Sequence, residues 1–186
     1  MHAWFRLLGD QYAGSLRSLR STRTLTTAGL LLAIQMVLSS YGVIEVTDSL
    51  KISLAHLALA PTAILFGPVT AAMQGALSDI LGFMLKPTGP YFPGFTLTAL
   101  LGGLIYGMAF YKTKRSVWQI IAARLVIIVF VNVLLNTVFL VMLYGPSRLA
   151  TLPLRAFKNI IQLPFDCLLL LAVSKAMRRI RLQPVR

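Results

Sequence analysis

The stretch VWQIIAARLVIIVFVNVLLNTVFLVML, residues 117–143, contains a single charged side chain, Arg124. A helix rises about 1.5 Å per residue, so this stretch is long enough to cross the ~30 Å hydrocarbon core of a bilayer. The rest of the chain has the same character, because 57% of its 186 residues are hydrophobic and its mean hydropathy is +0.78. A soluble domain of this size could not bury so much apolar surface. The sequence therefore predicts a protein embedded in a lipid bilayer.

Charged residues and Pro/Gly-rich turns divide the chain into six apolar segments of roughly transmembrane length. The six segments cover about residues 25–44, 52–65, 69–85, 94–110, 117–143 and 153–173. We therefore predict an all-α membrane protein with six transmembrane helices. Its predicted parts are an N-terminal segment 1–24, a six-helix domain 25–174 and a basic cytoplasmic tail 175–186.

Apolar side chains recur at helical spacing in the N-terminal segment. They are Trp4, Leu7, Leu8, Tyr12, Leu16 and Leu19. Arg6, Asp10 and Arg17 lie on other faces of the same helical wheel. This pattern predicts an amphipathic helix in the membrane interface on the cytoplasmic side.

Basic residues outnumber acidic ones strongly, and the net charge is +13 with a pI of 10.8. In a soluble chain this excess would indicate nucleic-acid binding. Here the Lys and Arg residues flank the apolar segments instead, which places both termini in the cytoplasm and makes nucleic acid an unexpected partner. We expect Arg124, near the start of the fifth segment, to snorkel toward the cytoplasmic surface.

Polar side chains interrupt the last two apolar segments, where they require a partner or a cavity. Asn132 and Asn136 lie one turn apart on the fifth segment, and a second polar series follows on the sixth. The second series contains Arg155, Lys158, Asn159, Gln162 and Asp166. Interhelical hydrogen bonding could explain such groups, but two cations and several amides at the outer ends favour a ligand site. Arg155 and Lys158 are too many turns from Asp166 to pair with it, so we interpret Asp166 as a structural group.

The predicted site suits an anionic ligand that also carries a polar heterocycle. Cations pair with carboxylates, and amides read the donor and acceptor edges of a ring. Aromatic faces at the same outer end, from Phe92, Phe95 and Tyr41, could stack on that ring or simply pack in the core. Asp79 is a second intramembrane acid, which we interpret as a hydrogen-bonded structural group or a ligand contact, with proton relay as a further alternative.

The sequence gives no sign of catalysis. It lacks the phosphate loop G-x-x-x-x-G-K-[ST] and the nucleophile elbow G-x-S-x-G. His2 and His56 have no Cys or acidic companion nearby in sequence, so we expect no metal site. Cys167 is the sole cysteine, which excludes an intramolecular disulfide. We predict a non-catalytic membrane protein without a cofactor.

Several short motifs together resemble the substrate-binding (S) component of energy-coupling factor (ECF) vitamin transporters. They are ISLAHL at 52–57, FGP at 66–68, Gly75-x-x-x-Asp79, PYFPGFTL at 90–97 and GGLIYG at 102–107. The FPGFT run at 92–96 is similar to the folate-specific branch. The resemblance covers nearly the whole chain, including its length and six spans. It implies that residues 25–174 form a substrate-binding domain in the cell membrane of a prokaryote.

The resemblance also implies partners. A transmembrane coupling subunit and two ATPase subunits would supply the energy, and the small residues Gly29 and Ala33 match the positions at which the family's first helix contacts the coupling subunit. Folate, with a pterin ring and two carboxylates, is the expected ligand. Another anionic vitamin such as pantothenate is the first alternative. A membrane scaffold and a proton-coupled carrier using Asp79 are the others.

Overall fold

The computed structural model describes every residue except 1, 41–42, 48–49, 88, 114–115 and 180–186. An N-terminal helix α1 (His2–Ser18) is followed by a bundle of helices and one pair of β-strands. The bundle elements are α2 (Thr22–Ser40), β1 (Val43–Thr47), β2 (Leu50–Ser53), α3 (His56–Phe66), α4 (Pro68–Leu85), α5 (Pro93–Phe110), α6 (Val117–Val126), η1 (Ile127–Leu135), α7 (Asn136–Tyr144), η2 (Pro146–Thr151) and α8 (Leu152–Arg179).

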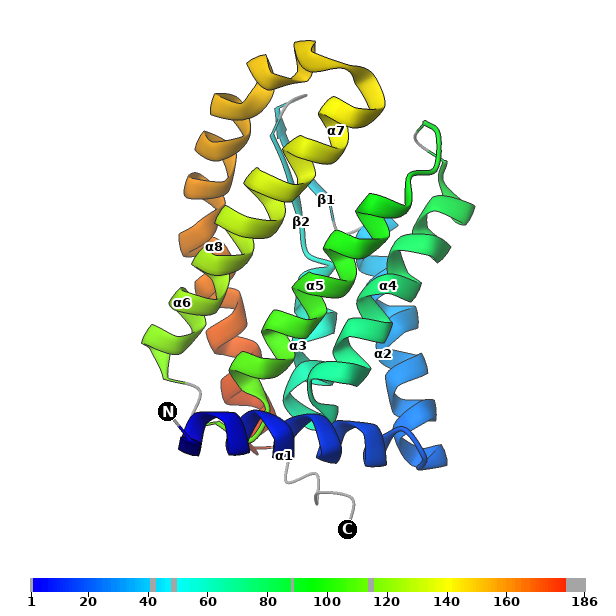
Figure 1. The fold of residues 1–186 in the computed structure, drawn as a ribbon, viewed down its shortest axis with the longest axis vertical. Coiled ribbons are helices and arrows are strands. Elements are labelled where there is room, and N and C mark those ends of the chain that lie inside the picture. The colour runs from blue at the N-terminus through cyan, green and yellow to red at the C-terminus, as the bar shows by residue number, and fades with distance from the viewer. Residues whose placement is uncertain (1, 41–42, 48–49, 88, 114–115, 180–186) are drawn as a thin grey trace.

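Helix α1 lies across one end of the bundle, nearly perpendicular to the other helices (Figure 1). The Ser15 hydroxyl accepts hydrogen bonds from the Val69 and Thr70 amides, at 3.1 and 3.3 Å, and so caps the start of α4. The Gln11 amide donates to the Tyr111 carbonyl directly after α5, at 2.9 Å. The helix predicted within residues 1–23 is therefore present and holds the ends of α4 and α5. Its place at the membrane surface stays a prediction.

The second predicted span was wrong at its start. Strands β1 and β2 pair in antiparallel fashion, with Ile44 opposite Ile52 and Val43 opposite Ser53, and α3 begins only at His56. The cause is local composition, because β-branched residues in a short alternating run favour a strand over a helix. For the same reason the first span ends at Ser40 and not at Ile44. The all-α prediction holds for the rest of the described chain.

Helices α4 and α5 form the tightest pair in the bundle, and glycine allows their backbones to touch. A Cβ atom added at three glycines would overlap backbone atoms of the neighbouring helix. The three close approaches pair Gly107 with Pro68, Gly103 with Ala71 and Gly75 with Ala99. The three contacts follow a regular antiparallel register. Small residues thus allow the two helices to approach closely, as is usual in membrane proteins.

The fifth predicted span is one continuous helix made of α6, η1 and α7, visible from light green to yellow in Figure 1. Its middle, η1, is a π-helix, a form that usually occurs as short segments near functional sites. In a regular α-helix of 3.6 residues per turn, Asn132 would be rotated by about 80° from Arg124. The wider π turn reduces that rotation. Arg124, Asn132 and Asn136 consequently line the same cavity.

Three helical segments among the described residues are long and apolar enough to cross a membrane. They are Pro93–Phe110, Val117–Tyr144 and Leu152–Met177. Large apolar side chains on the outside of the bundle, including Phe130, Met142 and Ile160, are more than half exposed. Such a belt is unfavourable in water and suits contact with lipid. The structure thus agrees with a helical, multi-pass membrane protein.

Candidate ligand-binding site

A cavity of about 1240 Å³ occupies the half of the bundle away from α1. It lies between α4 and α5 on one side and the α6–α7 helix and α8 on the other. Lys86, Tyr91, Tyr144 and Leu154 line it near the ends of these helices, and Tyr106 lies at its floor. The apolar core, which includes Tyr106, Phe110, Ile120, Ala123 and Leu170, packs below that floor. The cavity is large enough for a drug-sized ligand.

Nine of the ten residues predicted for the ligand site line this cavity. They are Asp79, Phe92, Phe95, Asn132, Asn136, Arg155, Lys158, Asn159 and Gln162. The tenth, Tyr41, lies outside the described residues. The structure therefore brings together side chains from α4, α5, the α6–α7 helix and α8. Their contact with a ligand stays a prediction.

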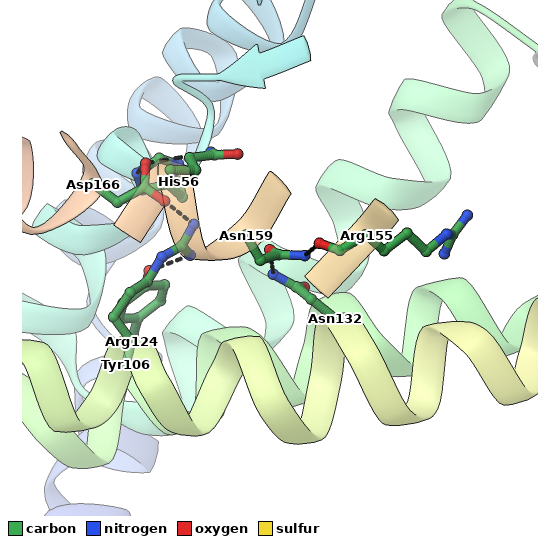
Figure 2. Close-up of polar contacts among 8 residues, drawn as sticks. His56, Tyr106, Arg124, Asn132, Arg155, Asn159 and Asp166 are labelled. Carbon is green, nitrogen blue, oxygen red and sulfur yellow. Dashed lines mark hydrogen bonds and ion pairs between the residues drawn. The ribbon is translucent and has the colours of Figure 1, made fainter. Parts of the chain in front are cut away.

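The polar series predicted on the last two spans also joins the helices. The Asn132 amide donates to the Asn159 side-chain carbonyl at 3.2 Å, and the Asn159 amide donates to the Arg155 backbone carbonyl at 2.9 Å (Figure 2). These bonds link η1 to the first half of α8. The sequence left two interpretations open for these residues, interhelical hydrogen bonding and a ligand site. The structure shows the hydrogen bonds, and the same residues line the cavity.

Asp79 is held on the α4–α5 side of the cavity by a short polar chain. The Thr96 hydroxyl donates to its carboxylate at 2.7 Å, and the Tyr91 and Thr96 hydroxyls lie 2.7 Å apart. Beside this chain the ring of Phe92 packs against those of Phe95 and Phe139, with centroids 5.9 and 5.6 Å apart. Thr96 of the FPGFT run thus holds Asp79, and Phe92 of the same run contacts Phe139 of α7.

The floor of the cavity contains a buried ion pair between Arg124 and Asp166 (Figure 2). Arg124 is 6% exposed, and Asp166 is fully buried. Arg124 also donates to the Tyr106 hydroxyl at 3.0 Å. The Asp166 carboxylate lies 3.2 Å from His56 Nε2 and accepts a hydrogen bond from Gln162 at 3.3 Å. Four elements, α3, α5, α6 and α8, meet in this floor cluster.

Two sequence-based expectations are corrected here. Arg124 does not snorkel toward the cytoplasmic surface, because the Asp166 carboxylate compensates its charge inside the bundle. His56 is not isolated, since the fold brings it to the same carboxylate. The interpretation of Asp166 as a group that holds helices together is consistent with these contacts. The sequence did contain a signal for this pair. Arg124 lies seven residues after the start of the fifth predicted span, at 117, and Asp166 lies seven residues before the end of the sixth, at 173. Their opposite charges are therefore at the same predicted depth.

Two further features were missed from the sequence. Lys86 lines the mouth with Arg155 and Lys158, so three cations surround the entrance. A buried chain of hydrogen bonds runs from Thr62 to Gln74 at 2.5 Å, from Gln74 to Gln35 at 2.8 Å and from Gln35 to Ser78 at 2.9 Å. This chain joins α2, α3 and α4, and two of its members, Gln35 and Ser78, line the cavity. The amide side chains of Gln35 and Gln74, which interrupt apolar segments, were the sequence signal for this hydrogen-bonded chain.

The charge distribution divides the cavity into two ends. The entrance is cationic, whereas the charges of Arg124 and Asp166 offset each other at the floor. Among the described residues no group of three His, Cys, Asp or Glu side chains is arranged to hold a metal ion. The site can bind a molecule that has anionic groups at one end and an uncharged polar ring at the other.

Comparison with known proteins gives consistent matches. Residues 23–177 match the family model described as the ECF transporter, substrate-specific component. The folate transporter FolT of Clostridium novyi is 36% identical over 136 residues, covering 73% of this chain and 79% of that protein. FolT of Leuconostoc mesenteroides is 34% identical over 151 residues, covering 78% and 80%. A crystal structure of FolT bound with folic acid has a TM-score of 0.76 and 32% identity, covering 84% of this chain and 95% of that one.

Proposed function

The chain belongs to the family of substrate-specific components of ECF transporters, and we propose that it binds folate at the outer membrane face for uptake into the cell. As a member of this family it is a transport subunit of the plasma membrane and not an enzyme. The ligand proposal is supported by the relatives, which are named folate transporters, and by the bound folic acid of the similar structure.

The observation that carries the ligand proposal is the division of the cavity into a cationic entrance and a neutral polar floor. Folate has a glutamate tail with two carboxylates and a pterin ring with several hydrogen-bonding edges. The tail suits Lys86, Arg155 and Lys158 at the mouth, and the ring suits the amides and aromatic faces deeper inside. Pantothenate carries one carboxylate and no ring, so it would leave the aromatic and floor groups unused.

Titration of the purified protein in detergent with folate, 5-formyltetrahydrofolate and pantothenate tests the proposal directly. We expect submicromolar binding of both folates and much weaker binding of pantothenate. Tight pantothenate binding without folate binding would mean that this member of the family binds a vitamin other than folate. Absence of binding to all three would leave the folate proposal without support.

The double variant Arg155→Ala/Lys158→Ala is expected to weaken folate binding by about 100-fold, because each lost carboxylate contact is worth roughly 1.5 kcal/mol. Both residues line the cavity mouth and are partly exposed. Calorimetric titration gives the affinity, and the melting temperature without ligand should remain close to that of the unmodified protein. Unchanged folate affinity would contradict a role for these cations in binding the carboxylates.

We infer the full topology from the same structure. The six predicted spans correspond to α2, α3, α4, α5, the α6–α7 helix and α8, with the first ending at Ser40 and the second shortened to α3. Helix α1 and the last turns of α8 lie at the same end of the bundle, which supports cytoplasmic termini (Figure 1). The predicted parts 1–24, 25–174 and 175–186 are kept. Protease protection of terminal tags in oriented vesicles tests this orientation.

Family membership also supports the expected energising module of a transmembrane coupling subunit and two ATPase subunits. Gly29 and Ala33 are exposed on the outer face of α2, and no atom lies within 4 Å of a Cβ placed at Gly29. This face carries small side chains on a helix otherwise flanked by exposed Leu30 and Ile34. It allows close approach of a partner helix, which is how small residues act in membrane interfaces.

The double variant Gly29→Leu/Ala33→Leu is expected to keep folate affinity while ATP-driven uptake falls by about tenfold or more, since a close helix contact is lost. Uptake of labelled folate in cells that express the whole module, together with co-purification of the coupling subunit, gives the two readings. Ala122→Leu is the matched control, because Ala122 is also exposed but lies on α6. An equal loss in the control would show a general effect of bulk on the membrane surface.

A further inference from the structure

Three exposed arginines lie at the corner where α1 meets α2, and we call this group the arginine corner. Arg17 is in the last turn of α1, Arg20 is in the connection, and Arg23 is in the first turn of α2. Within the described part of the chain, no carboxylate forms an ion pair with any of the three. Asp10 is the one acidic residue that precedes Glu45 in the sequence. The positive charge of the corner is therefore available to a partner.

The backbone of the arginine corner is fixed by hydrogen bonds. The Arg20 amide donates to the Arg17 carbonyl at 3.2 Å, and the Ser18 hydroxyl donates to the Ser15 carbonyl at 2.7 Å. Ser15 also caps the start of α4, which attaches this end of α1 to the bundle. A fixed backbone reduces the conformational entropy that is lost when a partner binds.

The arginine corner lies at the edge of the bundle. Helix α1 crosses one end of the bundle and meets the start of α2 at the perimeter (Figure 1). Leu16 and Leu25 lie beside the arginines in the chain and are 55% and 53% exposed. In the proposed orientation this end of the bundle is cytoplasmic, so the corner is level with the headgroups of the inner leaflet.

The side chains at the corner select the chemical class of the partner. All four Lys and Arg residues in positions 1–24 are arginines, and a guanidinium can bind a phosphate through two parallel N–H groups. Anionic lipids of the cytoplasmic leaflet attract such basic groups. A free phosphate would leave Leu16 and Leu25 uncovered, whereas a phospholipid brings acyl chains to the same place.

We propose that the arginine corner binds an anionic phospholipid of the inner leaflet. The lipid phosphate pairs with the guanidinium groups, and the acyl chains cover Leu16 and Leu25. The positive-inside rule requires basic residues on the cytoplasmic side but no bound lipid, so the proposal goes beyond it. It rests on the proposed orientation of the termini and is independent of the ligand in the cavity.

The double variant Arg17→Gln/Arg20→Gln tests this site. The probes are dioleoylphosphatidylglycerol and dioleoylphosphatidylcholine, and native mass spectrometry of the protein in detergent gives the dissociation constant of the first bound lipid. We expect the unmodified protein to prefer the glycerol lipid. The variant should bind that lipid about 10- to 30-fold more weakly, because each cation near an anionic surface contributes a factor of about five. Its affinity for the choline lipid should change by less than about threefold.

Lys112→Gln/Lys175→Gln is the matched control, since it removes two exposed cations from the same end of the bundle but from outside the corner. Its affinity for the glycerol lipid should change by less than about threefold. An equal loss in the control would show diffuse attraction and overturn the proposal. Equal affinity of the unmodified protein for the two lipids would overturn it as well.

Two further measurements distinguish the lipid from other partners. Glycerophosphoglycerol, the soluble headgroup without acyl chains, should not displace the lipid at millimolar concentration, and displacement would show that the corner binds a free phosphate. Unchanged lipid affinity of the Arg17→Gln/Arg20→Gln variant, together with lost co-purification of the coupling subunit, would assign the corner to a protein partner and overturn the proposal. The melting temperature in lipid-free detergent should match that of the unmodified protein, because both arginines are exposed.

Discussion

Asp166→Ala is expected to lower the free energy of unfolding by about 3–5 kcal/mol, because it leaves the Arg124 guanidinium charged and unpaired in the interior. Asp166 is fully buried, and its carboxylate contacts Arg124, His56 and Gln162. The substitution therefore removes the centre of a cluster that joins four elements. Thermal unfolding of the purified protein in detergent, followed by circular dichroism, should show a markedly lower midpoint.

Asp79→Ala is the matched control for this prediction. Asp79 is also an intramembrane acid that lines the cavity, but it is partly exposed and contacts the neutral hydroxyl of Thr96. Its removal should cost about 1 kcal/mol, the usual value of one hydrogen bond. The double variant Arg124→Met/Asp166→Leu should recover much of the loss seen in Asp166→Ala, since apolar pairs often replace buried ion pairs at little cost. A double variant as unstable as Asp166→Ala would contradict this explanation.

The sequence predicted the long helices well because a bilayer imposes a simple rule along the chain. Every backbone polar group in hydrocarbon must be satisfied internally, so long apolar runs such as 117–143 become helices. The rule fails where an apolar run is short. Residues 43–47 and 50–53 combine apolar β-branched residues with charged ones such as Glu45 and Lys51, and they form paired strands. Hydropathy alone does not predict this pairing.

The sequence predicted most of the residues that line the candidate site, but it did not predict the Arg124–Asp166 ion pair at its floor. Helical spacing placed Asn132 and Asn136 on one face and the polar residues of α8 on another, and the structure brings all of them except Asp166 to the lining of one cavity. The Arg124–Asp166 pair joins residues 42 positions apart in the chain, so it depends on how α6 packs against α8. The π-helix was also unpredictable from periodicity, because its amino acids are ordinary apolar helix residues.

Gly103→Val is expected to lower the free energy of unfolding by about 3 kcal/mol or more, since overpacking against a backbone cannot be relieved by rotating a side chain. The atoms nearest to a Cβ at Gly103 are the carbonyl group of Ala71 and the Cα atom of Ala72. Accommodating valine requires α4 and α5 to move apart. The yield of monodisperse protein in size-exclusion chromatography and the thermal midpoint should both fall sharply.

Gly102→Val separates this effect from the general cost of a β-branched residue in a helix. Gly102 is the preceding residue of the same helix, and nothing lies within 4 Å of a Cβ placed there. Its variant should fold with a midpoint near that of the unmodified protein, although it narrows the cavity that Gly102 lines. Because the two positions share helix, neighbours in sequence and substitution, a difference between them measures the α4–α5 contact itself. Similar instability of both variants would mean that the close approach of these helices does not control the fold.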